Sequence, residues 1–309
     1  MNVLVLGGYG AVGGHVVLLL RANGIAALAA GRDPVRADVT LDLSDLDSFT
    51  AALNDVAAVV NCAGTENIRL AEASAARGIP FLDISATSEY VQNLEEIAGP
   101  AVLGVGLAPG LTTLLAVDVL STHPGPLDIV IGLGSGERHG AAATAWTYGL
   151  LGQHFPDPDG SSVRNFTRPQ RFETPKESGY KPAPALRTDF ADQHRLTREF
   201  GVPVRTYLRM DTRLATTGLG LLTRAPALQA LAPKHMPGSD KWMVLARSSN
   251  GSSRWAAGRG QSVATAVVTA AAVRAAVDRN LTVPTWIHEI LRIDDLTDTL
   301  RANAITLGR

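Results

Sequence analysis

The sequence of 309 residues predicts an α/β protein with a doubly wound parallel sheet and a second, α+β domain. Short apolar runs alternate with helical patterns up to about residue 120, as they do in successive βαβ units. A glycine-rich turn joins the first apolar run to the first helical pattern. Beyond residue 120 the alternation stops, which indicates that a different kind of domain begins there.

The first domain contains five clear apolar runs. Residues 2–6, NVLVL, suit a central strand, because such a strand is buried on both faces. Residues 15–24 follow as a helix that ends at Gly24, since glycine readily adopts the left-handed conformation that closes a helix. The remaining elements predicted in this domain are strands over 25–32, 56–64, 79–85 and 101–109, and a helix over 65–78 closed by Gly78.

The second domain is less regular. Residues 156–190 are rich in proline, aspartate, glycine and arginine, so we expect irregular structure around short strands. Asn250 and Gly251 predict the turn of a β-hairpin. The other predicted elements are strands over 127–136 and 203–214, helices over 141–155 and 218–233, and a closing helix over 262–279 that is followed by a tail.

Composition and charge disfavour several classes of function. Hydrophobic residues make up 46% of the chain and charged residues 18%, as in ordinary globular proteins. The formal net charge of −1, without a charged block, gives no reason to expect nucleic acid or a membrane as a partner. The single cysteine, Cys62, allows no internal disulfide and no cysteine-based zinc site, so we predict no metal. We expect a cytoplasmic protein, because the N-terminus lacks the basic leader of a signal peptide.

The glycine-rich turn predicts a dinucleotide site. Its GxGxxG pattern follows a predicted strand and opens a predicted helix. Glycines at these positions allow a tight turn, a close approach of the pyrophosphate and close packing of helix on strand, and the helix N-terminus attracts the phosphates. The alternative is a glycine bend with a purely structural role. The predicted cofactor contacts in the turn are Gly7, Gly8, Tyr9, Gly10, Ala11, Val12 and Gly13.

The end of the second predicted strand favours NADP over NAD. This strand ends at Gly31 and Arg32, and a guanidinium there suits the 2′-phosphate of NADP. NAD sites usually place an acidic residue at this point, and Asp33, one position later, keeps NAD as the less favoured alternative. Arg32 could also be a solvated loop residue.

Further cofactor contacts are predicted where other strands end, because ligands of such sheets bind beyond the carboxyl ends of the strands. A role for Cys62 as a nucleophile is less favoured than small-residue packing, since no histidine or lysine lies beside it in the sequence. These contacts are Asp42 and Leu43 beside the adenine, and Asn61, Cys62, Ala63, Gly64 and Ser85 across the strand ends.

Several segments together resemble the saccharopine dehydrogenase-like reductases. VLGGYGAVGGHV looks like their cofactor turn, VVNCAG like the end of their fourth strand, and GVGLAPGLTTLLA like their Gly-x-x-Pro-Gly-Leu segment. GIPFLDISATSEYV is similar to their strand of the form Tyr-x-Asp-x-(Ser/Thr)-Gly-Glu, except that Ala86 and Thr87 stand where Gly-Glu is frequent. GRGQSVATAVVTAAAVRAAV and VPTWIHEIL resemble the closing helix and tail. The resemblance covers residues 1–120 and 255–295.

This resemblance implies NAD(P)-dependent reduction of an imine, or oxidation of a secondary amine, on a small polar metabolite. The lost carboxylate at Thr87 leaves two alternatives open: a non-catalytic NAD(P)-binding sensor, and a C=O or C=C reductase on the same fold. The apolar closing segments allow a homodimer. We expect a Rossmann domain over 1–118, a substrate domain over 119–258, and a segment over 259–309 that packs back on the Rossmann domain.

The proton donor is less well defined. The candidates are Tyr148, His139 and His154, at or near the predicted helix of the second domain, and Asp83, which equally suits a loop cap. No tyrosine is followed by lysine four residues later, which disfavours the short-chain dehydrogenases.

Arginines of the second domain offer a possible substrate wall. Arg205, Arg209 and Arg213 share one parity, so a continuous strand would direct them to one face. That face would be either a basic wall for a substrate carboxylate or a solvated outer surface.

Overall fold

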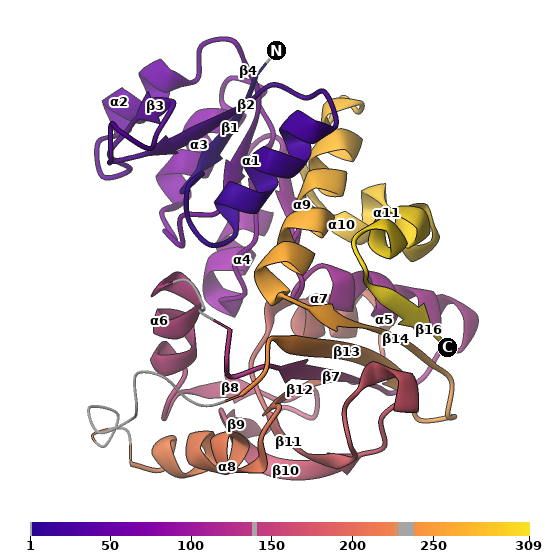
Figure 1. Ribbon diagram of the computed structural model, residues 1–309. Coiled ribbons are helices and arrows are strands. Elements are labelled where there is room, and N and C mark those ends of the chain that lie inside the picture. Colours follow the sequence, from indigo (N-terminus) through magenta and orange to yellow (C-terminus); the bar gives the residue numbers. More distant parts are fainter. Residues whose placement is uncertain (1, 138–140, 226, 228–237) are drawn as a thin grey trace. The chain divides into compact units, whose positions relative to one another are not determined.

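The computed structural model describes residues 2–137, 141–225, 227 and 238–309 (Figure 1). The chain forms two compact units, Met1–Leu111 with Ser262–Leu296 (unit 1) and Thr112–Gln261 with Thr297–Arg309 (unit 2). A parallel α/β unit together with a unit built on a mixed sheet confirms the predicted fold class.

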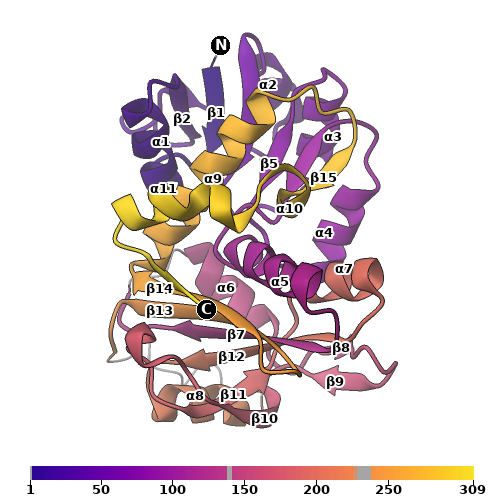
Figure 2. The same ribbon diagram turned by 90° about the vertical axis from the view of Figure 1, so that its right-hand side faces the viewer.

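Unit 1 is a doubly wound parallel sheet. Its seven strands lie in the order β15-β6-β5-β4-β1-β2-β3, with helices on both faces (Figure 2). The order of β3 to β6 is that of a Rossmann fold, whose switch point lies between β1 and β4. The strands are β1 (Asn2–Leu6), β2 (Ala27–Gly31), β3 (Val39–Thr40), β4 (Val56–Asn61), β5 (Phe81–Asp83), β6 (Ala101–Leu103) and β15 (Pro284–Trp286).

The helices of unit 1 follow the predicted alternation. The predicted closing helix is α9, whose alanine-rich sequence is buried along most of its length. Thr269 of α9 donates its hydroxyl hydrogen to the carbonyl of Val105, 2.8 Å away. The helices are α1 (Gly13–Ala22), α2 (Leu46–Ala52), α3 (Ile68–Ala75), α4 (Ser88–Glu95), α9 (Gln261–Val277), α10 (Ile287–Ile290) and the 3-10 helix η3 (Ile293–Leu296).

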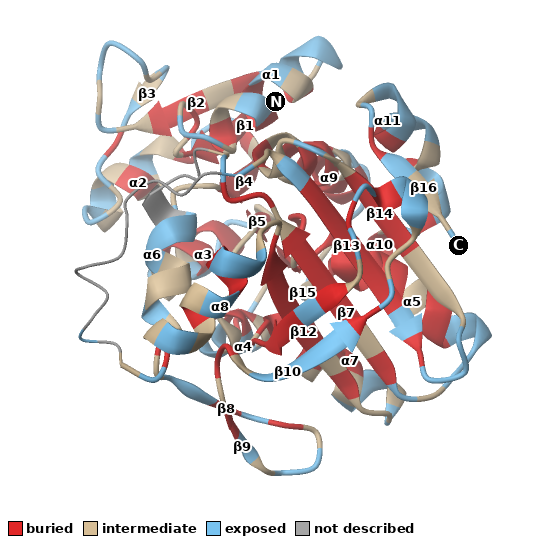
Figure 3. Ribbon diagram, turned by 60° about the horizontal axis from the view of Figure 1, so that its bottom comes forward, coloured by how far each residue is buried: buried red, intermediate tan, exposed pale blue. Residues whose placement is uncertain are grey.

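Unit 2 is built on a seven-stranded mixed sheet in the order β10-β11-β12-β7-β13-β14-β16. Only β12 and β7 are parallel neighbours, and the central strands are buried (Figure 3). The strands are β7 (Leu127–Leu133), β10 (Thr167–Phe172), β11 (Ala183–Arg187), β12 (Val204–Met210), β13 (Lys241–Ser248), β14 (Ser253–Arg259) and β16 (Thr306–Gly308), with a separate hairpin of β8 (His154–Pro156) and β9 (Ser162–Arg164).

The helices of unit 2 lie between and after these strands. They are α5 (Leu111–Thr122), α6 (Ala141–Gly149), α7 (Ala191–Phe200), α8 (Arg213–Leu222), α11 (Thr297–Ala302) and the 3-10 helix η1 (Lys176–Ser178). None of the helices in the described part of the chain is long and apolar enough to cross a membrane.

Two predictions about unit 2 need correction. The helix expected over 141–155 ends at Gly149, and its last two residues belong to β8. The helix expected over 218–233 begins earlier, because the Thr212 hydroxyl accepts a hydrogen bond from the Ala215 amide and starts α8 at Arg213. Residues 226 and 228–233 of that expected helix lie outside the described residues.

The end of the chain also differs from the expected arrangement. We expected residues 259–309 to pack on the Rossmann domain, and Ser262–Leu296 do belong to unit 1. Thr297–Arg309 belong to unit 2, because β16 pairs antiparallel with β14 and extends its sheet. The first boundary lies at Leu111 instead of residue 118, so most of α5 belongs to unit 2.

Candidate functional site

The glycine-rich turn connects the buried strand β1 to α1. Gly7 adopts φ 68°, in the left-handed region, and its carbonyl accepts a hydrogen bond of 2.8 Å from the Gly10 amide. Among the described residues, no side chain caps the N-terminus of α1, and its first turn contains no acidic residue. The amides at this helix end therefore suit an anion.

Three glycines of the turn are required by the packing of the backbone. A Cβ atom at Gly13 would lie 2.3 Å from the Gly7 carbonyl oxygen, and one at Gly8 would lie 2.5 Å from the Cα of Ala29 in β2. A Cβ at Gly7 would lie 2.8 Å from the Cα of Ala63. Gly10 is different, because it is exposed and a Cβ there would approach only the Gly7 oxygen, at 3.1 Å. Its open side matches the role of a glycine that a pyrophosphate approaches.

Tyr9 links the turn to the end of β2. Its ring packs on Gly31, and its hydroxyl accepts a hydrogen bond of 3.0 Å from the Asp33 amide. Arg36 covers the other side of Tyr9: its guanidinium lies 4.4 Å from the ring centroid and donates to the Tyr9 carbonyl at 2.8 Å. Sequence reasoning missed Arg36, because only the fold brings it to Tyr9, 27 positions away.

Arg32 is exposed directly after β2, next to this cluster. The side chain of Asp33 caps its own turn, since Oδ1 accepts a hydrogen bond from the Val35 amide. Two exposed guanidiniums, those of Arg32 and Arg36, thus belong to the segment that follows β2, whereas the Asp33 carboxylate accepts a hydrogen bond within its own turn.

The predicted adenine contacts follow β3. Asp42 is exposed and accepts hydrogen bonds from the amide and hydroxyl of Ser44, which lower its pKa. Leu43 is partly exposed beside it. Both residues lie in the loop that connects β3 to α2.

The ends of β4 and β5 carry a buried polar network. Asn61 and Asp83 stand opposite each other in the register, and the Asn61 amide donates to Asp83 Oδ2 at 2.7 Å. The same oxygen accepts from the Tyr90 hydroxyl at 3.0 Å, and Oδ1 accepts from the Ser85 amide at 2.6 Å. Burial raises the pKa of Asp83, although these three donors lower it in part. Asp83 is therefore buried with three hydrogen-bond donors on its carboxylate.

Cys62 follows Asn61 at the end of β4. Burial and the neighbouring Asp83 raise the pKa of its thiol, which keeps the sulfur protonated at neutral pH and disfavours a nucleophilic role. Ala63 and Gly64 continue the chain with small side chains, and Ala63 lies directly against Gly7 of the turn. Four of the predicted contacts, Asn61 to Gly64, therefore adjoin the glycine turn at the switch point between β1 and β4.

A carboxyl group that sequence reasoning missed lies beside this network. Glu66 accepts a short hydrogen bond from the Thr87 hydroxyl. Partial burial raises the pKa of Glu66, and the nearby charges of Asp83 and Glu89 add to the increase. Thr87 stands where the resembling family has glutamate, so Glu66 supplies a carboxyl group next to the position that lost one.

The proton donors predicted in unit 2 have different surroundings. Tyr148 is partly exposed on α6. His154 is exposed on β8, with Arg164 donating to its ring at 3.4 Å. His139 lies outside the described residues.

The basic wall, one of the two alternatives for Arg205, Arg209 and Arg213, is not formed by these three residues. Arg213 is the first residue of α8 and leaves the strand, while Arg209 is buried and donates to the Lys181 carbonyl at 2.7 Å. Only Arg205 is partly exposed within β12, where it lies 3.7 Å from Asp157. The shared parity predicted the face of Arg205 and Arg209, but the strand ends before Arg213.

Comparisons with known proteins fit this geometry. The sequence profile of the NAD dependent epimerase/dehydratase family matches residues 3–92, which contain the glycine turn and the ends of β2, β4 and β5. No curated protein matches the sequence. Solved structures match over almost the whole chain.

The fold resembles saccharopine dehydrogenase. The enzyme of this name (L-Glu forming) from Saccharomyces cerevisiae aligns with 100% of both chains, with a TM-score of 0.61 and 12% identity. Homospermidine synthase from Legionella pneumophila, solved in complex with NAD, aligns with 99% of this chain and 90% of its own, with a TM-score of 0.66 and 11% identity. The DAP dehydrogenase of C. glutamicum, solved with DAP, has a TM-score of 0.51 and 15% identity over 96% of this chain and 98% of its own. At this identity the similarity confirms the saccharopine dehydrogenase-like fold.

Proposed function

We propose that this protein is an NADP-dependent oxidoreductase of the saccharopine dehydrogenase type that reduces a C=N bond, or oxidises the corresponding amine, on a small polar metabolite. The observation that carries the proposal is the turn from Gly7 to Gly13, with its three sterically required glycines and one open glycine. Its place beside the switch point of a Rossmann sheet supports a dinucleotide ligand.

The residues of unit 1 fit the cofactor part by part. The exposed backbone at Gly10 and Ala11, before an uncapped helix, suits the pyrophosphate. Arg32 and Arg36 suit the 2′-phosphate of NADP, with the ring of Tyr9 orienting Arg36. Asp42 and Leu43 would flank the adenine, and Asn61, Cys62, Ala63, Gly64 and Ser85 would line the nicotinamide end.

A bound nicotinamide cofactor supplies the hydride, so the protein has to position the substrate and supply a proton. Asn61, Tyr90 and Ser85 hold Asp83 rigidly, which fixes the strand ends on which a substrate would rest. Glu66 is more accessible than Asp83. Because its pKa is raised, its carboxyl group stays protonated to a higher pH than that of an ordinary glutamate. Thr87 orients that carboxyl group through its hydroxyl. We therefore add Glu66 to Tyr148 and His139 as proton-donor candidates.

The NADP preference is tested with Arg32→Gln and Arg36→Gln. Each substitution removes one guanidinium near the 2′-phosphate, so we expect NADPH affinity to fall by about tenfold while NADH affinity changes by less than about twofold. Arg274→Gln, at an exposed position of α9, serves as the matched control. Equal effects on both cofactors would contradict the assignment of these arginines to the 2′-phosphate.

The reaction is tested by following NADPH absorbance with cyclic imines and with pairs of keto acids and amines. Turnover of an imine or of a keto acid–amine pair supports the proposal. Turnover of keto acids without amine, or of enones alone, would favour the C=O or C=C reductase.

A sensor is a second candidate, because the family carboxylate is replaced at Thr87. Tight NADPH binding without turnover of any panel compound, in the wild-type protein, would favour it. A homodimer and a cytoplasmic location stay predictions.

A further inference from the structure

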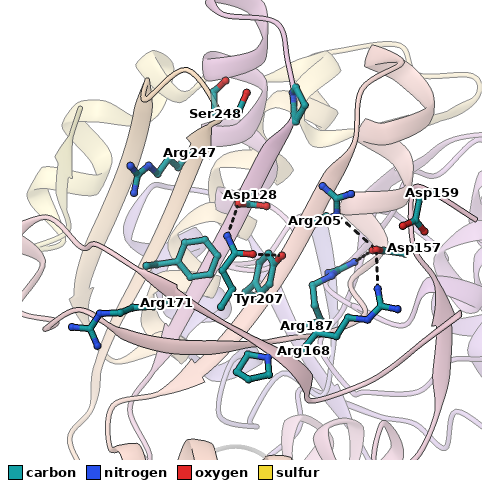
Figure 4. A pocket seen from close by; sticks show the side chains of 15 residues that line it. Asp128, Asp157, Asp159, Arg168, Arg171, Arg187, Arg205, Tyr207, Arg247 and Ser248 are labelled. Carbon is teal, nitrogen blue, oxygen red and sulfur yellow. Dashed lines mark hydrogen bonds and ion pairs between the residues drawn. The ribbon is translucent and has the colours of Figure 1, made fainter. Parts of the chain in front are cut away.

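Unit 2 contains a charged groove of about 840 Å³ (Figure 4). This volume lies within the range of small-molecule sites. The groove is lined by residues of unit 2 alone, among them five arginines and three aspartates. With every carboxyl group ionised, the lining carries an excess of two positive charges. None of these residues belongs to the proposed dinucleotide site.

The floor of the groove is a row of charges across three neighbouring strands. Asp128 of β7 stands opposite Arg205 of β12 on one side and opposite Arg247 of β13 on the other. Residues opposite each other in register point to the same face of a sheet. Neighbouring strands lie about 4.8 Å apart, so the backbones of the two arginines are about 10 Å apart.

A second carboxylate is shared among three guanidiniums. Asp157 forms a short ion pair with Arg187, and lies 3.4 Å from Arg168 and 3.7 Å from Arg205. Arg187 is buried, and its Nη1 also donates to the Gln193 side chain and the Thr206 carbonyl, whereas its Nε has no hydrogen-bond partner among the described residues. Asp159 and Asp128 lie near the same arginines, so three carboxylates share the charge of the five groove arginines.

Other cations at the groove are not neutralised. In the described part of the chain, Arg171 and Arg247 form no ion pair within 4.0 Å. Both are exposed at the groove, and Arg247 occupies one end of the row on the floor. An internal ion-pair network would balance its charges, whereas the lining of this groove has two more arginines than aspartates, and both Arg171 and Arg247 are exposed.

An unpartnered buried group lies in the same wall. The Ser248 side chain is 2% exposed, and its hydroxyl has no hydrogen-bond partner among the described residues. Ser248 lines the groove, but it directly follows Arg247 in β13, so the two side chains point to opposite faces of the sheet, and the arginines rather than this hydroxyl carry the site.

We propose that this groove binds a small molecule with two or more anionic groups, either carboxylates or phosphates, between Arg205 and Arg247. Guanidiniums hold both kinds of oxyanion with paired hydrogen bonds. The distance of about 10 Å between the backbones of Arg205 and Arg247 favours a ligand whose acidic groups are separated by several bonds. The site goes beyond the proposed oxidoreductase function, because its lining includes none of the residues proposed to bind the dinucleotide or to donate a proton.

Calorimetric titration of the full chain tests the proposal. The probes are citrate for the carboxylates and pyrophosphate for the phosphates, at constant ionic strength. In the Arg205→Gln/Arg247→Gln double variant, we expect the affinity for at least one probe to fall by about tenfold or more. Arg301→Gln, which removes an exposed arginine of α11, should leave both affinities within about twofold. The probe that binds more tightly to the wild type identifies the ligand chemistry.

Three results would overturn the proposal. One is no binding of either probe, and another is binding that the double variant retains, as expected for pyrophosphate held at the glycine turn. The third is a dimer of the wild type that the double variant dissociates, which would make a second copy the occupant of the groove. NADPH binding should be equal in the double variant and the wild type, so failure of the cofactor proposal is detected separately. If the double variant does not fold, Arg247→Gln alone serves, since that side chain is exposed.

Discussion

The packing of the glycine turn is best probed at Gly13, the first residue of α1. Its hypothetical Cβ lies 2.3 Å from the Gly7 carbonyl oxygen, 2.9 Å from the Gly7 carbonyl carbon and 3.0 Å from the Gly8 Cα. All three atoms belong to the backbone, so no side chain can move away. Gly14 is the matched control, because a Cβ there has no neighbour closer than 3.9 Å.

The size of the effect follows from these distances. Cβ atoms essentially never approach another heavy atom within 3.0 Å, so Gly13→Ala has to move the Gly7 carbonyl by at least 0.7 Å, from 2.3 to 3.0 Å. Overpacking of this kind costs about 1–3 kcal/mol. Both variants gain the helix propensity of alanine over glycine, up to about 1 kcal/mol. The difference between the two free energies of unfolding therefore isolates the steric cost.

The same displacement should weaken cofactor binding. A shift of 0.7 Å takes a hydrogen bond of about 2.9 Å beyond the range of effective contacts. Losing one bond to a charged phosphate costs about 1.5–3 kcal/mol, or about tenfold to a hundredfold in affinity.

Urea denaturation and NADPH fluorescence titration of Gly13→Ala and Gly14→Ala measure both effects. We expect only Gly13→Ala to lose stability and affinity. Equal behaviour of the two variants would refute the steric reasoning.

Three further predictions concern charged groups. Asp157→Ala leaves Arg187 buried without its carboxylate, so the free energy of unfolding in denaturant should fall by about 3–5 kcal/mol. Asp298→Ala removes one partner of an exposed ion pair and should lower it by less than about 1 kcal/mol. Similar losses in the two variants would contradict a stabilising role of the buried pair. Asp83 has a raised pKa, so the native state binds a proton that the unfolded state releases, and stability falls as pH rises from about 4 through the native pKa. The free energy of unfolding of Asp83→Asn should be about 1–3 kcal/mol below that of the wild type at low pH, and the difference should shrink at higher pH. A difference that does not depend on pH in urea titrations would contradict the raised pKa of Asp83. Glu66→Gln should lower kcat on an accepted imine by about a hundredfold or more, and it should remove the decline in rate at high pH. The control variant Glu72→Gln, on α3, should change neither kcat nor the pH profile. An unchanged pH profile in Glu66→Gln would exclude Glu66 as the proton donor.

Local patterns predicted the architecture of unit 1 well. The run NVLVL, the glycine turn and the glycines that close helices at Gly24 and Gly78 each act within a few residues, so spacing alone identifies them. The proximity of Asn61 to the glycine turn and to Asp83 was predictable too, because the carboxyl ends of parallel strands lie at one edge of the sheet.

Contacts between distant segments were not predictable in this way. Arg36 reaches Tyr9 only after β2 has returned beside β1, and Thr87 reaches Glu66 only when β4 and β5 lie side by side. In unit 2, the charged row depends on β7 lying between β12 and β13, an order that no periodicity reveals. The unexpected start of α8 likewise rests on one cap at Thr212.

Titration of the purified protein with NADPH and NADH, followed by nicotinamide fluorescence, tests the central claim most directly. The claim is that the turn from Gly7 to Gly13, with Arg32 and Arg36, binds a phosphorylated dinucleotide. We predict saturable binding of one NADPH per chain, about tenfold or more tighter than that of NADH. Absence of saturable binding for both cofactors would contradict the claim.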